Sequence, residues 1–141
     1  MTMLEQHRQK LREEFSEFED GFERYAYLVE ISGMLPPMAG AQHTENNLVK
    51  GCQSQVWIHT YAKDGCFWFD ADSDTLIIKG VLLLLQDLLC GVPLAEAAAV
   101  DLDVLSDAGL TGEFSDTRQK GIGAAMRMLK EQAAYLLTHD T

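Results

Sequence analysis

The chain has 141 residues, of which 47% are hydrophobic and 23% are charged, so it holds enough apolar material for one domain with a core. Its formal net charge at pH 7 is −11. This charge argues against nucleic acid and anionic membranes as partners, because both attract concentrated Lys and Arg. It favours a basic patch on another protein.

We expect no targeting or membrane-spanning segment. Residues 1–15 are charged and lack the apolar stretch of a signal peptide, and the apolar run 81–85 is far shorter than a bilayer span. The three cysteines, an odd number, disfavour a closed disulfide framework. These features predict a cytoplasmic protein with a single domain over residues 1–141.

Two amphipathic helices are expected in the first 35 residues. Apolar residues share one face of the first helix: Leu4, Leu11, Phe15 and Phe18. Asp20 with Glu23 predicts a capping box at the start of the second helix. The residues expected to face inward from that helix are Phe22, Tyr25, Leu28 and Val29.

Strand patterns occupy the centre of the chain. A short strand is expected at Leu48-Val49, a longer one from Val56 to Tyr61, and another from Cys66 to Phe69. Asp64-Gly65 predicts the hairpin turn between the last two, because a tight turn needs positive φ angles.

Helices return after the strands. Residues 75–90 are apolar on nearly all sides, which predicts a buried helix, and Asp72 or Asp74 is expected to cap it. Short helices are expected at 93–99 and 103–108, and Ser115 or Asp116 is expected to cap a last helix. The order of elements predicts an α+β fold, with a small three-stranded antiparallel sheet packed against helices.

Metal and nucleotide motifs are weak in this sequence. The three cysteines, Cys52, Cys66 and Cys90, are too far apart in sequence for the close ligand pairs of structural zinc sites. Gly121-Ile122-Gly123 follows no predicted strand and lacks a third glycine, so we interpret it as a place of close helix packing.

Cys52 is the strongest candidate for chemistry. It follows Gly51 in a polar loop between two predicted strands, whereas Cys90 lies in a leucine-rich helix and Cys66 opens a strand. Lys50 is the nearest cation in the sequence, and the residues after Cys52 are the potential hydrogen-bond donors Gln53, Ser54 and Gln55. Such neighbours favour a thiolate, which is the reactive form of cysteine. A bystander loop cysteine is an equal alternative on these residues alone.

The stretch from Asn47 to Trp57, NLVKGCQSQVW, resembles the signature of the SufE family of sulfur acceptors in iron–sulfur cluster assembly. Three further segments are similar to the family in the same order along the chain. They are residues 24–36 with Arg24-Tyr25 and Leu35-Pro36, residues 72–80 (DSDTLIIKG), and residues 114–126 (FSDTRQKGIGAAM). The likeness runs from about residue 15 to about residue 135.

The resemblance implies a SufE/NifU-like fold and a sulfur carrier, not an enzyme. A partner cysteine desulfurase, SufS-like or a paralogue, would use pyridoxal phosphate to form a persulfide. Cys52 would accept that sulfur, stimulate the desulfurase and pass the sulfur to a SufB-like scaffold. Gly51, Gln53, Ser54 and Arg118 would support the site. The chain itself would hold no cofactor or metal, and Cys52 would shelter against apolar residues between transfers.

Two alternatives stay open at this point. The first is a zinc or iron scaffold that uses Cys52, Cys66 and a histidine. The second is an adaptor that regulates a desulfurase without carrying sulfur.

Overall fold

The computed structural model describes residues 1–110 and 114–139. It begins with α1 (Met3–Phe15) and α2 (Gly21–Ile31). Thr2 closes a capping box with Glu5 at the start of α1, and Asp20 accepts a hydrogen bond from the Glu23 amide at the start of α2. Both side chains satisfy amide groups that a helix leaves free at its first turn.

The sheet has three antiparallel strands in the order β1-β2-β3. They are β1 (Val56–Lys63), β2 (Cys66–Ser73) and the two-residue β3 (Val92–Pro93). Asp64 and Gly65 take φ angles of 54° and 74°, which confirms the predicted hairpin turn. The expected strand at Leu48-Val49 is only an isolated bridge between Leu48 and Trp57. The third strand instead comes from the segment that follows the central helix.

The central helix α3 (Leu76–Leu89) is buried along most of its length, as its apolar sequence predicts. It packs closely against α2, because a Cβ atom at Gly80 would lie 2.2 Å from the carbonyl oxygen of Leu28. That approach tolerates only glycine. The expected caps at Asp72 and Asp74 are wrong, since Thr75 holds the cap position without a capping side-chain bond.

The contact at Gly80 also decides which side of α2 is buried. Leu28 and Ile31 face the core, whereas Phe22, Tyr25 and Val29 are exposed. The prediction that these three residues point inward is therefore wrong. The helix carries apolar residues on two sides, and only the side that meets α3 is covered.

The C-terminal part contains α4 (Leu94–Ala98), the 3-10 helix η4 (Val104–Ala108) and the long α5 (Asp116–His139). Ser115 accepts a hydrogen bond from the Arg118 amide, which confirms the predicted cap of the last helix. Three further 3-10 helices lie between α2 and β1: η1 (Ser32–Met34), η2 (Gly40–Gln42) and η3 (Glu45–Asn47).

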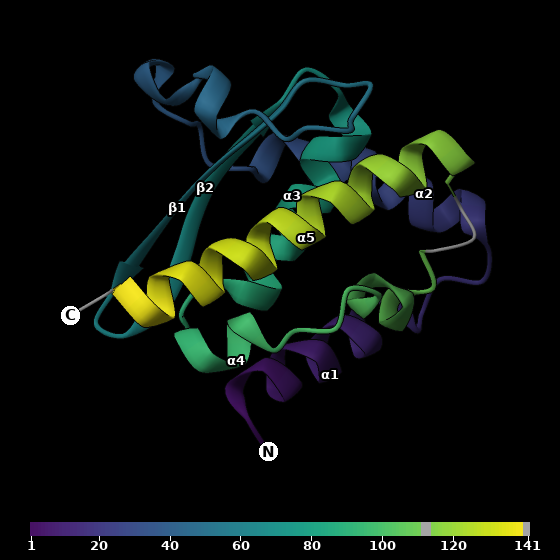
Figure 1. Ribbon diagram of the computed structural model, residues 1–141. Coiled ribbons are helices and arrows are strands. Elements are labelled where there is room, and N and C mark those ends of the chain that lie inside the picture. The colour runs from purple at the N-terminus through teal and green to yellow at the C-terminus, as the bar shows by residue number, and fades with distance from the viewer. Residues whose placement is uncertain (111–113, 140–141) are drawn as a thin grey trace.

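Helices and sheet form the predicted α+β arrangement. In Figure 1, α5 runs across α3, and β1 and β2 form a long hairpin beside the two helices. One apolar cluster joins residues of these elements, among them Ile58, Phe67, Leu82 and Leu129. Within residues 1–110 and 114–139, no helix has the length and hydropathy needed to span a bilayer.

Candidate functional site

Cys52 lies on a loop of residues 50–55 that precedes β1. A backbone hydrogen bond joins the residues on either side of the loop: the Val49 amide donates to the Val56 carbonyl at 2.8 Å. Gly51 then takes a φ of 93°, a left-handed conformation that side chains rarely adopt. Gly51 is therefore required by the turn that directs Cys52 toward α5.

The far side of the loop is tied to the junction of β2 and α3. The Gln55 amide donates to the Asp74 carboxylate at 3.1 Å, and the Asp74 amide donates back to the Gln55 carbonyl at 3.3 Å. The Ser54 hydroxyl lies 2.8 Å from the Thr75 hydroxyl. Asp74, expected as a helix cap, thus holds the Cys52 loop.

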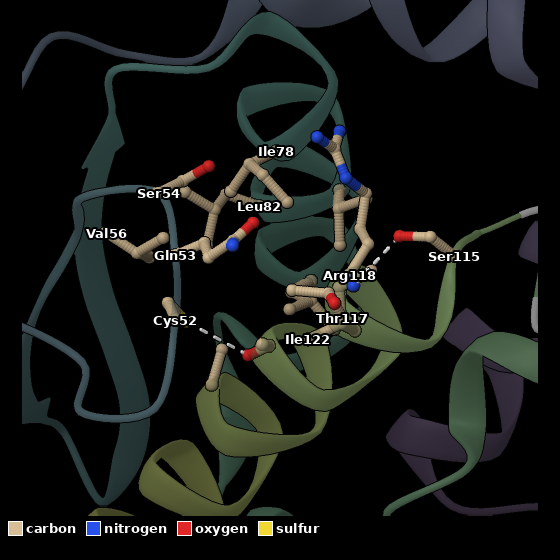
Figure 2. Close-up of a pocket in the computed structure, with 14 residues that line it drawn as sticks. Cys52, Gln53, Ser54, Val56, Ile78, Leu82, Ser115, Thr117, Arg118 and Ile122 are labelled. Carbon is tan, nitrogen blue, oxygen red and sulfur yellow. Dashed lines mark hydrogen bonds between the residues drawn. The ribbon is translucent and has the colours of Figure 1, made fainter.

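The Cys52 thiol is half-buried against α5. It donates a hydrogen bond to the Gly121 carbonyl at an Sγ–O distance of 3.2 Å, and this bond is drawn in Figure 2. A Cβ atom at position 121 would lie 3.3 Å from Sγ. The role of Gly121 is therefore to make room for the thiol, and the prediction that it serves helix packing is wrong.

The thiol opens onto a pocket of about 70 Å³ between the loop, α3 and α5. Apolar side chains make up the α3 side: Ile78, Val81, Leu82 and Leu85. From α5 come Thr117, Arg118, Gly121, Ile122 and Ala125. Gln53 and Ser54 complete the lining on the loop side. The expectation that Cys52 shelters against apolar residues agrees with this geometry.

Arg118 lies in the first turn of α5 and lines the same pocket. In Figure 2 its side chain extends away from Cys52, so the guanidinium group lies at the other end of the pocket from the thiol. The Nη1 atom of Arg118 is buried, and none of residues 1–110 and 114–139 accepts a hydrogen bond from it. A buried donor of this kind is suited to an anion that enters the pocket.

The local electrostatics differ from the sequence-based expectation. Burial raises the pKa of the Cys52 thiol above its ordinary value. Lys50 is exposed and lies 3.7 Å from Glu45, and Ser54 bonds to Thr75, so neither supports a thiolate at Cys52. The expected support from Lys50 and Ser54 is therefore absent in the resting site. Burial thus favours the neutral thiol in the resting site.

The other two cysteines lie elsewhere. Cys66 pairs with Lys63 at the turn end of the hairpin, whereas Cys52 precedes its opposite end. The intervening strand has eight residues and spans roughly 23 Å. The metal scaffold that uses both Cys52 and Cys66 is therefore excluded by the register of the hairpin. No cluster of three or more potential metal ligands occurs within residues 1–110 and 114–139.

Cys90 ends α3, where burial raises its thiol pKa to about 11. Its sulfur lies 3.8 Å from the Phe69 carbonyl oxygen. Cys90 is half-buried and packs against the core, so the prediction of a buried apolar side chain holds only in part.

Fold and site together define a class of protein. It is a small α+β domain that presents one thiol at the mouth of a pocket with an apolar side on α3 and a buried arginine donor across from the thiol. A thiol so placed can accept or release a group covalently while the pocket limits its contact with water.

The chain belongs to the SufE family. The family model described as "Fe-S metabolism associated domain" matches residues 9–133. An uncharacterized SufE-like protein of Rhizobium meliloti (strain 1021) is 30% identical over 138 residues, which cover 94% of this chain and 96% of the relative. This membership associates the protein with iron–sulfur metabolism and implies a sulfur carrier, not a classical enzyme.

A solved structure supports the fold independently. The solution structure of a hypothetical protein from Thermus thermophilus aligns with a TM-score of 0.79 and 22% sequence identity. The alignment covers 94% of this chain and 96% of that protein.

The structure brings together most of the residues predicted for the site. Cys52, Gln53, Ser54 and Arg118 line one pocket, and Gly51 shapes the loop. Two contributions were missed, those of Gly121 and Asp74. Both lie in segments that resemble the family, and Gly121 ends the Ser-x-x-Arg-x-x-Gly pattern of the last helix. The resemblance marked these positions, but their contacts with the loop required the fold.

Proposed function

We propose that the protein accepts sulfur on Cys52 from the persulfide of a pyridoxal-phosphate-dependent cysteine desulfurase and delivers it for iron–sulfur cluster assembly. The observation that carries this proposal is the Cys52 thiol at the mouth of a small pocket whose α3 side is apolar. Pyridoxal phosphate belongs to the desulfurase, and this chain holds the sulfur as a covalent persulfide. The expected location is the cytoplasm.

The transfer is an exchange at sulfur. The Cys52 thiolate attacks the terminal sulfur of the partner's persulfide, and a new sulfur–sulfur bond forms on Cys52. The old sulfur–sulfur bond breaks, and its electron pair stays on the partner's cysteine, which takes up a proton. No external oxidant or reductant is consumed. The persulfide on Cys52 is then attacked by the next acceptor in the same way.

The raised thiol pKa separates the resting and reacting states. In the pocket Cys52 is protonated and donates to Gly121, so it is a poor nucleophile. Attack requires the thiolate, and the pocket disfavours that form. We therefore propose that the loop leaves the pocket when the desulfurase docks, and that the thiol ionises in the partner's site.

The pocket suits the loaded state when the loop returns. A volume of about 70 Å³ has room for one added sulfur atom, since about 10–15 Å³ of such cavity space already holds a water molecule. Apolar walls keep oxidants and competing thiols from the persulfide. Arg118 supplies a buried Nη1 donor in the same pocket. We propose that Arg118 supports the sulfur anion or contacts the desulfurase during docking.

The remaining alternative is an adaptor that stimulates a desulfurase without carrying sulfur. The test uses a cognate desulfurase with free cysteine and measures sulfide or alanine release with the wild-type chain and with Cys52→Ser. Carriage predicts that Cys52→Ser loses the stimulation, whereas Cys66→Ser, the matched control, keeps it. Full stimulation by Cys52→Ser would show that the protein acts as an adaptor, and it would contradict sulfur transfer through Cys52.

A further inference from the structure

The outer side of α2 is an apolar surface that the fold leaves uncovered. Phe22 is 82% exposed, Tyr25 41% and Val29 37%. With Ala26 these residues recur at the spacing that places them on one side of a helix. We call this set the α2 face. Apolar residues at this spacing are typical of a helix surface that packs in a core. In this fold, however, the core packs against the other side of α2.

A hollow beside the α2 face offers a place for an inserted side chain. It is about 370 Å³ in volume and lies between α2 and Phe18, bordered by Phe22, Ala26 and Tyr27. The aromatic rings of Phe18 and Tyr27 are fixed there, since their centroids are 5.0 Å apart and both pack on Phe15. The hollow is shallow and open to solvent, and a shallow apolar depression beside an exposed apolar ridge can receive one face of a helix.

Charge indicates what kind of partner fits. Residues 16–35 contain five acidic side chains and one basic side chain, Arg24. Glu23 and Glu30 border the hollow itself, and both are exposed. Arg24 points instead toward the position of Gly109, 3.5 Å from where a Cβ atom there would lie. The α2 face is thus an apolar stripe beside negative charge.

A second copy of this chain fits poorly, because it would bring the same carboxylates against one another. A partner segment with apolar side chains flanked by Lys or Arg fits both features. We infer that the α2 face is a docking surface for a basic, amphipathic helical segment of another protein. This inference goes beyond the proposed sulfur transfer and does not depend on it.

Docking at the α2 face leaves the Cys52 pocket free. The Leu28 backbone meets α3 at Gly80, whereas Ile78, Leu82 and Leu85 of α3 line the pocket. At 100° per residue, these pocket residues lie roughly 140–160° around α3 from Gly80, and Val81, which also lines the pocket, lies about 100° around from it. The pocket therefore lies on a different side of α3 from the contact with α2. A partner on α2 can stay bound while the Cys52 loop engages another protein.

The test uses two labelled peptides of about 16 residues, long enough to form a helix on binding. Both carry Leu at helical i, i+3, i+4 and i+7 positions, and one has Lys flanks while the other has Glu flanks. Fluorescence anisotropy measures their affinity for the full chain, and amide chemical shifts locate the contact. We expect the Lys-flanked peptide to bind at least about tenfold more tightly and to shift α2 amides.

Variants then test the surface itself. Phe22→Ser with Val29→Ser should weaken Lys-peptide binding at least about tenfold, because such anchors dominate small interfaces. Tyr135→Ser on α5, a residue 56% exposed, is the matched control and should bind like wild type. Glu23→Lys with Glu30→Lys should reverse the preference to the Glu-flanked peptide.

Three results would overturn the inference. They are no binding of the Lys-flanked peptide, equal binding of both peptides, or binding that the Phe22→Ser and Val29→Ser changes leave intact. A wild-type dimer that these changes dissociate would instead assign the face to a second copy. Sulfur loading of Cys52 in the Phe22→Ser, Val29→Ser variant is measured separately, so failure here and failure of the proposed function are distinguishable.

Discussion

The Cys52 thiol donates to the carbonyl oxygen of Gly121 across 69 positions of sequence, at an Sγ–O distance of 3.2 Å. The contact joins the loop before β1 to the first turns of α5. It depends on the missing side chain at position 121, because a Cβ there would lie 3.3 Å from Sγ. The resting position of the thiol is therefore set by a residue far away in sequence.

Gly121→Ala is expected to displace Cys52 from its place against α5. Cβ contacts of 3.3 Å are tight, and the loop must move to relieve them. We expect faster alkylation of Cys52 by iodoacetamide at pH 7, measured by peptide mass spectrometry. Gly123→Ala is the matched control in the same helix, where the added Cβ meets only the end of the Arg127 side chain. It should keep wild-type reactivity and stabilise the fold by about 0.5–1 kcal/mol. Equal reactivity of the two variants would argue against the contact.

The pH dependence of Cys52 follows from its burial. The folded-state pKa is raised, so the fold favours the protonated thiol. This contribution to stability is present below the unfolded pKa of about 8.5 and is lost as the pH rises toward the folded value. We expect Cys52 alkylation to titrate above pH 8.5, measured as rate against pH. Titration at or below that value would show that the loop activates the thiol.

The pair of His43 and Asp72 predicts a second pH effect. Their side chains lie 2.7 Å apart, and Lys79 lies 3.7 Å from the same carboxylate. The hydrogen bond raises the pKa of His43, and the bonds from His43 and Ser73 lower that of Asp72. The stabilisation by His43 is complete below its unfolded pKa of about 6.5 and is lost as pH rises through the folded value. The stabilisation by Asp72 is lost as the pH falls through the lowered pKa of its carboxyl group.

Urea unfolding between pH 5 and 8 tests this pair. His43→Gln should flatten the decline in stability on the alkaline side, and Asp72→Asn should flatten it equally. The double variant should add nothing further to that change, because the two residues act on one interaction. Independent, additive slopes would contradict the pairing.

Among the glycines of residues 1–110 and 114–139, Gly80 is expected to be the least replaceable. Gly80→Ala places a Cβ 2.2 Å from the Leu28 carbonyl, so α2 must move away from α3. We expect a loss of about 3 kcal/mol or more in the free energy of unfolding, since backbone has no alternative rotamer. Gly33→Ala, with no atom within 4 Å, is the control and should be close to neutral.

A single unfolding transition for the wild-type chain would also support the prediction of one domain over residues 1–141.

Strong patterns in the sequence predicted most of the fold. Three local patterns each predicted the structure that is found: the apolar run of α3, the Asp64-Gly65 turn and the Asp20 cap. The sequence did not predict β3, because two residues form a strand only when β2 lies beside them. The buried side of α2 was predicted wrongly for a related reason. Both of its sides are apolar, and the close approach at Gly80 decides between them.

The candidate site divides in the same way. Cys52, Gly51 and Arg118 were indicated by short motifs and by the resemblance to the SufE family. The protonated resting thiol was not indicated, because the burial that raises its pKa comes from α3 and α5. The donors expected from Lys50 and Ser54 are turned toward Glu45 and Thr75 instead. Lys50 and Ser54 are near Cys52 in the sequence, but in the folded chain their side chains interact with other residues.

The central claim is that Cys52 carries sulfur, and mass spectrometry tests it most directly. The chain is incubated with its cognate desulfurase and free cysteine, alkylated, digested and analysed peptide by peptide. We predict one extra sulfur atom on the Cys52 peptide, removed by a reductant and absent when the desulfurase or cysteine is omitted. Extra sulfur confined to the Cys66 or Cys90 peptides, or none on any peptide while the desulfurase turns over, would contradict the account.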